Sequence, residues 1–144
     1  MVHQRHGLSV SGAFTTSSGR VRLDWSPDER LVLMSFPREG ETATEADAGE
    51  AVARMASWAG GEPLRLLVDC RGLASTDAGW RAEFAGFFRG RGWRDRVAWA
   101  HMNPLVGMMV TMFVRATRLE GRSFRGVDEA RTWLLARPLE ARAS

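Results

Sequence analysis

The sequence has one cysteine, Cys70, and no lysine, isoleucine or tyrosine. A single thiol excludes a disulfide within the chain and a zinc site built from several thiolates. The longest apolar stretch, residues 105–114, is about half as long as a membrane-spanning helix requires. The first residues also lack the charged and apolar segments of a signal peptide. We therefore expect a cytoplasmic protein without a transmembrane segment.

All 20 basic residues are arginine, and with 17 acidic residues the formal net charge is only +3. The sequence pI of about 10.7 is high because no lysine or tyrosine titrates near pH 10. Frequent arginine, alanine and glycine without lysine or isoleucine is also typical of a GC-rich bacterial genome. The charge therefore reflects composition more than a strong positive field, and we do not expect a nucleic-acid partner.

The length of 144 residues and the hydrophobic content of 44% are typical of one domain with a single core. Residues 1–19 mix glycine, serine, threonine and histidine without apolar periodicity, so a flexible N-terminal tail is expected there. The folded domain is expected over 20–138, followed by a short C-terminal tail over 139–144.

Five segments have the patterns of β-strands. Alternating apolar residues over 21–25, a Ser-Pro-Asp-Glu turn over 26–29 and the apolar run 31–36 predict a hairpin. The nearly continuous apolar run 64–70 predicts a central strand that is buried on both faces. Two further strands are expected over 96–102 and 122–125.

Four segments have the patterns of helices, and residues 71–77 are expected to form a loop. The helices are expected from a capping box at Thr42 and Glu45 to Gly60, from Asp77 to Gly90, from Asn103 to Gly121, and over 127–137. The third of these is apolar over much of its circumference, so we expect it to be mostly buried.

Strands and helices alternate through the second half of the chain, which requires parallel strands joined by right-handed helical crossovers. The predicted fold class is therefore α/β. It is a small sandwich with the order β-β-α-β-α-β-α-β-α and a mostly parallel sheet that begins with an antiparallel hairpin.

This order resembles the STAS family, which includes SpoIIAA-like bacterial anti-sigma-factor antagonists and cytoplasmic domains of sulfate transporters. In that family an acidic or amide residue ends the central strand, and a DSSG motif, whose first serine is phosphorylated by a cognate kinase, begins the next helix. Here Asp69 ends the strand LLVDC, and Asp77 follows eight residues later in DAGW. Ala78 falls where the phosphorylated serine would lie, and Gly79 arrives one residue early. The resemblance therefore implies a relative without the acceptor hydroxyl.

The segments LLVDCRGL and SFRGVDEARTWL are also similar to STAS-like proteins that are grouped with lipid-binding CRAL-TRIO domains. The resemblance covers residues 20–137, nearly the whole expected domain. A shared fold does not transfer an activity, so the function must be argued from the site itself.

The segment after the central strand is the expected partner-binding surface. Its residues are Arg71, Ser75, Thr76, Asp77, Ala78, Gly79 and Trp80. We expect Asp77 to cap the following helix, and we leave open whether Ser75 or Thr76 accepts a phosphate or serves as an ordinary loop residue. The leading hypothesis is a non-enzymatic regulatory or scaffold protein that binds a protein partner through this surface.

Eight arginines surround two connections that a parallel sheet places at one edge. They are Arg89, Arg91, Arg94, Arg96, Arg115, Arg118, Arg122 and Arg125. If they converge, the patch suits an acidic protein, an anionic lipid or a nucleic acid. The alternative is a solvated rim, because acidic residues lie among them and codon usage favours arginine.

A second hypothesis is a binder of a lipid or other apolar small molecule. Its cavity would lie under the sheet and be lined by Phe84, Phe87, Phe88, Met108 and Met112. Large aromatic side chains and adaptable methionines favour such a cavity, although the same residues also make ordinary cores.

An enzymatic hypothesis pairs Cys70 with His101, because both lie near the ends of neighbouring strands. Asp69 and Asp77 are the alternative acid–base pair. Structural roles are favoured for all four, so we predict no catalytic residue. The sequence shows no cluster of metal ligands and no glycine-rich phosphate loop, so no metal or cofactor is expected. The oligomeric state is left open, a homodimer included.

Overall fold

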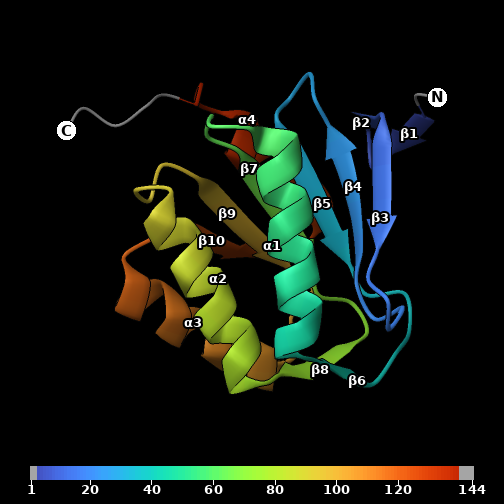
Figure 1. The fold of residues 1–144 in the computed structure, drawn as a ribbon, viewed down its shortest axis with the longest axis vertical. Coiled ribbons are helices and arrows are strands. Elements are labelled where there is room, and N and C mark those ends of the chain that lie inside the picture. Colours follow the sequence, from blue (N-terminus) through green and yellow to red (C-terminus); the bar gives the residue numbers. More distant parts are fainter. Residues whose placement is uncertain (1–2, 140–144) are drawn as a thin grey trace.

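The computed structural model describes residues 3–139, which are built around one six-stranded sheet (Figure 1). The strand order is β10-β9-β7-β5-β4-β3. These strands are β3 (Gly12–Thr15), β4 (Arg22–Ser26), β5 (Leu31–Ser35), β7 (Arg65–Asp69), β9 (Arg96–Ala100) and β10 (Glu120–Phe124). Strands β5, β7, β9 and β10 are parallel, whereas β3, β4 and β5 pair antiparallel. The predicted mostly parallel sheet with an antiparallel hairpin is confirmed.

Helices cover both faces of this sheet. Within residues 3–139 they are α1 (Glu45–Ala59), α2 (Ala78–Gly90), α3 (Pro104–Thr117) and α4 (Val127–Leu135). Figure 1 shows α1 and α2 side by side in front of the sheet. Because side chains alternate along a strand, Leu66 and Val68 of β7 join the core with α1, α2 and α3, while Leu67 joins the core with α4. The predicted α/β sandwich is therefore present.

The N-terminal segment is more ordered than predicted. Residues 3–15 form β1 (His3–Arg5), β2 (Leu8–Val10) and β3, so the expectation of a flexible tail over 1–19 is wrong for them. Leu8 and Val10 are buried in the core beside α4. Two apolar positions are too few to give a periodic signal in the sequence. Residues 140–144 of the predicted C-terminal tail lie outside the described residues.

The expected loop 71–77 contains a strand. Strand β8 (Leu73–Thr76) pairs in parallel with β6 (Glu41–Ala43) to form a separate two-stranded ribbon. Leu73 is buried, so the backbone beside it needs hydrogen-bond partners, and β6 supplies them. As Thr42 lies in β6, the first helix begins two residues later than predicted.

The starts of α1 and α3 both carry side-chain caps of the kind expected from the sequence, although the cap of α1 lies two residues later. Thr44 caps α1 and forms the capping box with Asp47, in place of the predicted Thr42 and Glu45. Asn103 caps α3 as predicted, because its Oδ1 accepts a hydrogen bond from the Val106 amide at 2.8 Å.

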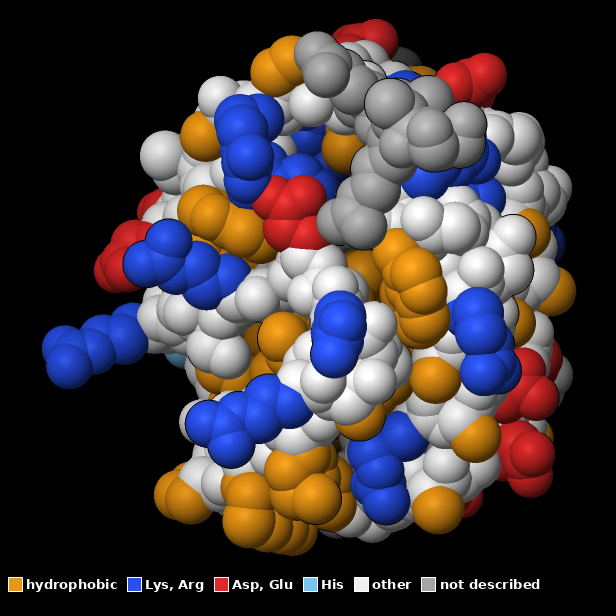
Figure 2. Space-filling model, turned by 90° about the vertical axis from the view of Figure 1, so that its left-hand side faces the viewer, with side chains coloured by type: hydrophobic (Ala, Val, Ile, Leu, Met, Phe, Trp, Pro, Cys, Tyr) orange, Lys and Arg blue, Asp and Glu red, His pale blue; other side chains and the backbone are white. Residues whose placement is uncertain are grey.

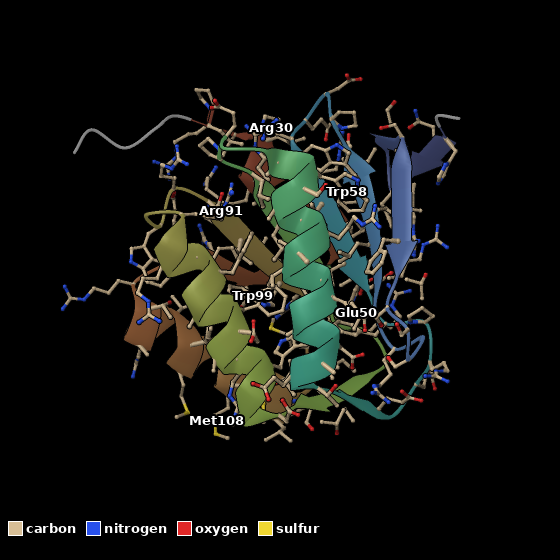
Figure 3. All side chains as sticks on the ribbon, viewed as in Figure 1. Arg30, Glu50, Trp58, Arg91, Trp99 and Met108 are labelled. Atoms are coloured by element: carbon tan, nitrogen blue, oxygen red, sulfur yellow. The ribbon has the colours of Figure 1, made fainter. Side chains whose placement is uncertain are left out.

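Helix α3 is less buried than predicted. Only one side of it packs against the sheet, and Leu105, Met108 and Met112 are 44%, 55% and 63% exposed. Met108 projects outward at the lower edge of the molecule in Figure 3. When apolar residues surround a helix on all sides, their spacing does not show which side faces solvent. The spacing of apolar residues in α3 therefore could not predict this exposure. None of the helices in the described residues is long and apolar enough to cross a membrane.

Candidate functional site

Three helices begin around the β6–β8 ribbon, at the end of the sheet where its parallel strands finish (Figure 1). The Asn103 side-chain amide at the start of α3 donates to the carbonyls of Leu73 and Ala74 at 3.0 and 3.1 Å. The Asp77 amide before α2 donates to the Ala43 carbonyl at 2.9 Å. The ribbon thereby fixes these helix starts relative to each other.

Eight exposed or half-buried residues of this region are named the β8 surface. They are Thr42, Glu45, Arg71, Ser75, Thr76, Asp77, Ala78 and Gly79. Six of the seven residues of the predicted partner-binding segment are among them. Ala78 is exposed in the first turn of α2.

Asp77 joins the starts of two helices. One carboxylate oxygen accepts a hydrogen bond from the Trp80 amide at 2.8 Å, and the other accepts one from the Glu45 amide at 3.3 Å. The partial positive charge at each helix start stabilises the carboxylate. The predicted capping role of Asp77 is confirmed.

Gly79 allows α1 and α2 to approach closely. A Cβ atom at position 79 would lie 2.9 Å from Cγ and Cδ of Glu45, and closer still to its Cβ. Because the Glu45 Cβ is fixed to the α1 backbone, it cannot rotate out of the way. A larger residue at position 79 would therefore push the two helix starts apart.

The two candidate hydroxyls point in different directions. Ser75 Oγ lies 2.9 Å from Thr42 Oγ1 across the ribbon, on the accessible side. Thr76 Oγ1 instead donates to Met109 Sδ at 3.6 Å and accepts a hydrogen bond from Arg81 Nη1 at 3.0 Å. Thr76 therefore contacts α2 and α3, and Ser75 faces the ribbon.

Arg71 contacts the end of the neighbouring strand. Its Nη2 lies 2.9 Å from Nε2 of His101. As a guanidinium can only donate, Nε2 is the acceptor and the ring proton is assigned to Nδ1. The Asp69 carboxylate accepts a hydrogen bond from the Arg71 amide at 3.1 Å. Asp69 thus binds a backbone amide, as Asp77 does, and no hydrogen bond joins the two carboxylates in the described part of the chain.

Cys70 is a buried, neutral thiol. It is 2% exposed, and its Sγ lies 3.9 Å from the Val68 carbonyl. Burial, with a smaller contribution from the Asp69 charge, raises the pKa of the thiol to about 12. A thiol is a weak nucleophile unless it is deprotonated. Among residues 3–139 no hydrogen bond joins Cys70 to His101, whose Nε2 lies beside Arg71, so the Cys–His pair of the enzymatic hypothesis is not seen.

Trp80 belongs to the core and not to the β8 surface, so the prediction that it contributes to a recognition surface is wrong. Its side chain is 8% exposed and packs against Phe36 and Phe84, with ring centroids 6.2 and 4.7 Å away. Trp80, Phe84 and Phe88 are spaced by four residues and therefore lie on one side of α2, which faces the sheet.

An apolar cavity of about 60 Å³ lies beneath the β8 surface, between the sheet, α2 and α3. Trp99 of β9, which Figure 3 shows behind α1 and α2, forms part of its floor. Thr76 and Arg81 are its polar lining side chains besides the Cys70 thiol. A cavity was predicted in this place, but not with this lining.

Phe84 and Phe88 line the cavity as predicted, whereas Phe87, Met108 and Met112 do not. Met109 is the methionine of α3 that turns inward beside Val106, Val110 and Phe113. Residues 108 and 112 are one turn apart on the exposed side of the helix, so the predicted lining had the wrong helical phase.

Three of the eight predicted patch arginines have their charges bound within the protein. Arg91 pairs with Asp95 at 2.8 Å, and Arg94 donates to the Gly61 carbonyl at 2.7 Å. Arg96 is buried, lies 3.2 Å from a Glu120 carboxylate oxygen, and stacks 4.1 Å from the Trp133 ring centroid. Burial lowers its pKa, with the Glu120 charge acting in the opposite direction.

The eight arginines do not converge into one patch. Arg96 begins β9, whereas Arg125 follows the far end of the parallel strand β10, so these two lie at opposite ends of the sheet. Arg122 lies over the Phe124 ring at 5.6 Å. The remaining three, Arg89, Arg115 and Arg118, are exposed near the ends of α2 and α3. Figure 2 shows basic side chains spread between apolar ones on one face.

Four residues of this region were not identified from the sequence. Thr42 and Glu45 were assigned to a capping box, and their meeting with β8 depends on contacts distant in sequence. Arg81 and Met109 meet at the cavity, where Arg81 Nη1 lies 3.6 Å from Met109 Sδ. Trp80 and Phe84 lie four residues apart and define the buried side of α2, and residue 81 lies at the border of that side. This spacing could have indicated Arg81 as a residue that lines the cavity.

Among residues 3–139, no group of three or more histidine, cysteine, aspartate or glutamate residues is arranged to hold a metal ion.

Two solved structures are similar to this chain in fold. One is an uncharacterized DUF3478-family protein with a SpoIIAA-like fold from Shewanella loihica PV-4, with a TM-score of 0.59 and 17% identity over 85% of this chain and 93% of that chain. The other is a putative anti-sigma factor antagonist from Thermotoga maritima, with a TM-score of 0.54 and 10% identity over 74% of this chain and 88% of that chain. Neither a protein-family model nor a curated protein sequence matches the chain. The chain thus has the SpoIIAA-like, STAS-like fold, and at these identities the likeness extends to the fold alone.

Proposed function

We propose that this protein is a non-enzymatic regulatory module that binds a cytoplasmic protein partner through the β8 surface. The observation that carries the proposal is the position of Ala78, exposed in the first turn of α2 where two helix starts and the β6–β8 ribbon meet. The description of the Thermotoga maritima neighbour as a putative anti-sigma factor antagonist supports a protein partner.

The β8 surface suits a partner rich in hydrogen-bond acceptors. A helix start has about four amide groups without an intrahelical acceptor, and Asp77 satisfies one of these in each of α1 and α2. Arg71, whose Nη2 lies 2.9 Å from His101 Nε2, adds an exposed guanidinium to the β8 surface. The methyl group of Ala78 cannot carry a phosphate, so binding at this position is not controlled by phosphorylation of residue 78.

Site-specific crosslinking tests this proposal. A photoreactive residue is placed at position 78 or, as the control, at exposed position 89 in the same helix, about 16 Å away. We expect one protein to be crosslinked in cells from position 78 and not from position 89.

Two substitutions then test whether that protein binds the β8 surface. Ala78→Asp places a charge on the surface and should abolish copurification of the crosslinked protein. Arg89→Asp makes a larger charge change at the control position and should leave copurification unchanged. Equal crosslinking from both positions, or equal binding by both variants, would contradict the proposal.

A binder of an apolar small molecule is the second candidate function, and the cavity between α2, α3 and the sheet favours it. Its walls are mostly apolar side chains, which an apolar ligand can contact. Native mass spectrometry of protein purified from cells should then show a ligand-bound mass besides the mass of the chain. A single mass equal to that of the chain alone would count against this candidate.

A further inference from the structure

Arg81 places a positive charge beside the apolar cavity. The residue lies in the first half of α2, is half-buried, and lines the cavity together with Thr76 and Met109. Each ion pair among residues 3–139 involves other arginines, so no described carboxylate pairs with Arg81. A half-buried guanidinium without a carboxylate partner suits an anionic ligand.

The guanidinium of Arg81 is held in a fixed position. Its Nη1 donates to the Thr76 carbonyl at 2.8 Å and to Thr76 Oγ1 at 3.0 Å, and lies 3.6 Å from Met109 Sδ. These bonds use one of the three guanidinium nitrogens. Nε and Nη2 have no hydrogen-bond partner among residues 3–139, and they form the edge of a guanidinium that binds the two oxygens of one carboxylate.

The size of the cavity limits the apolar part of the ligand. One water-sized group requires about 10–15 Å³ of such volume, so a cavity of about 60 Å³ holds a chain of roughly four or five carbon atoms. Met34 and Met109 are part of its wall, and methionine side chains adjust easily to the shape of a ligand. The other walls near Arg81 are the aromatic rings of Trp80 and Phe84.

We propose that this cavity binds a small monocarboxylic acid, with the carboxylate on Nε and Nη2 of Arg81 and a chain of about four or five carbons among Trp80, Phe84 and Met109. The inference rests on the second candidate function and names its ligand class. It does not depend on the partner that binds the β8 surface.

Methyl NMR of protein with ¹³C-labelled methionine methyl groups tests the proposal. Hexanoate is the probe, 1-hexanol is its uncharged counterpart, and acetate carries the carboxylate without the chain. With hexanoate we expect the Met34 and Met109 signals to shift and the signals of exposed Met108 and Met112 to stay unchanged. Hexanol should bind more weakly at the same methionines, and acetate should cause no shift.

Variants separate the contribution of the Arg81 charge to ligand binding from the contribution of the apolar cavity. Arg81→Gln should weaken hexanoate binding about tenfold, as expected for the loss of one charge-assisted interaction, and leave hexanol binding unchanged. Arg89→Gln, at the exposed end of the same helix, is the matched control and should change neither. Val110→Leu reduces the cavity volume and should weaken both probes while Arg81 stays intact.

The outcomes distinguish this inference from the candidate function beneath it. Equal binding of hexanol and hexanoate, unchanged by Arg81→Gln, would overturn the carboxylate assignment and leave an apolar ligand in place. Shifts confined to Met108 and Met112 would move the binding site to the outer side of α3 and overturn the inference. No shift with any probe at millimolar concentration would remove both the inference and the second candidate function.

Discussion

Replacing Gly79 by alanine tests the close approach of α1 and α2, on which the β8 surface depends. The new Cβ would lie within 2.9 Å of two Glu45 side-chain carbons and closer to the Glu45 Cβ, so one helix start must move. Overpacking of this kind costs about 1–3 kcal/mol. Alanine regains up to about 1 kcal/mol in helix propensity over glycine. We expect Gly79→Ala to lower the free energy of unfolding by about 1–2 kcal/mol.

Gly86 provides the matched control, because it lies in the same helix and a Cβ there would meet no atom within 4 Å. Gly86→Ala should therefore raise the free energy of unfolding by about 0.5–1 kcal/mol, so the two substitutions have opposite signs. Urea unfolding followed by tryptophan fluorescence measures both. Each kcal/mol corresponds to a change in Tm of about 2–4 °C in a chain of this size.

A third variant tests whether contact with Glu45 causes the loss of stability in Gly79→Ala. Glu45→Gly removes the nearest carbon atoms, so Gly79→Ala should cost less in that background than in the natural sequence. If Gly79→Ala stabilises the protein as Gly86→Ala does, α1 and α2 do not approach closely at position 79, and the described geometry of the β8 surface is wrong.

Three further predictions follow from buried and capping groups. Asp77→Ala should lower the free energy of unfolding by about 1–2 kcal/mol in urea unfolding, because one carboxylate caps two helices, and Asp77→Asn should lose less than half of this. Cys70 should not react with iodoacetamide at pH 8 in the folded protein and should react in urea, because burial raises its pKa to about 12. Burial of the Asp47 carboxylate favours its neutral form and so raises its pKa. Hydrogen bonds to the carboxylate, the strongest of them from Arg20, have the larger effect, and the pKa of Asp47 is lowered. The stability that this lowered pKa provides is present above the unfolded-state pKa and is lost as the pH falls through the folded-state value, so acid unfolding below about pH 4 should be less steep in Asp47→Asn.

The sequence was sufficient to predict features that depend on neighbouring residues. The Asp77 and Asn103 caps and the buried strand Arg65–Asp69 were found because each signal lies within a few residues. The parallel sheet then followed from the alternation of strands and helices. Local patterns and a connection rule were enough for the central architecture.

Features that depend on distant pairing were missed. Strand β6 is a strand because it pairs with β8, about 30 residues away, and neither has an alternating apolar pattern of useful length. The N-terminal strands are stabilised by the burial of Leu8 and Val10 against α4, more than 100 residues later. Such contacts are set by tertiary packing and have no counterpart in a short sequence window.

The candidate site was partly predictable for the same reason. Trp80 and Arg81 are adjacent in sequence, but successive residues of a helix point about 100° apart, so one is in the core and the other lines the edge of the cavity. The spacing of Trp80, Phe84 and Phe88 set the phase of α2. Helix α3 is apolar around most of its circumference, so the sequence did not show whether Met108 or Met109 faces the cavity.

The groups that looked most reactive in the sequence are bound to their surroundings in the structure. Asp69 and Asp77 accept hydrogen bonds from backbone amides, the Cys70 thiol is buried and neutral, and the His101 Nε2 accepts from Arg71. Arg81 differs from them, because two of its guanidinium nitrogens have no hydrogen-bond partner among residues 3–139 and its side chain lines a cavity. Donor groups beside a cavity, and not reactive residue types alone, are therefore the basis of the proposed ligand site.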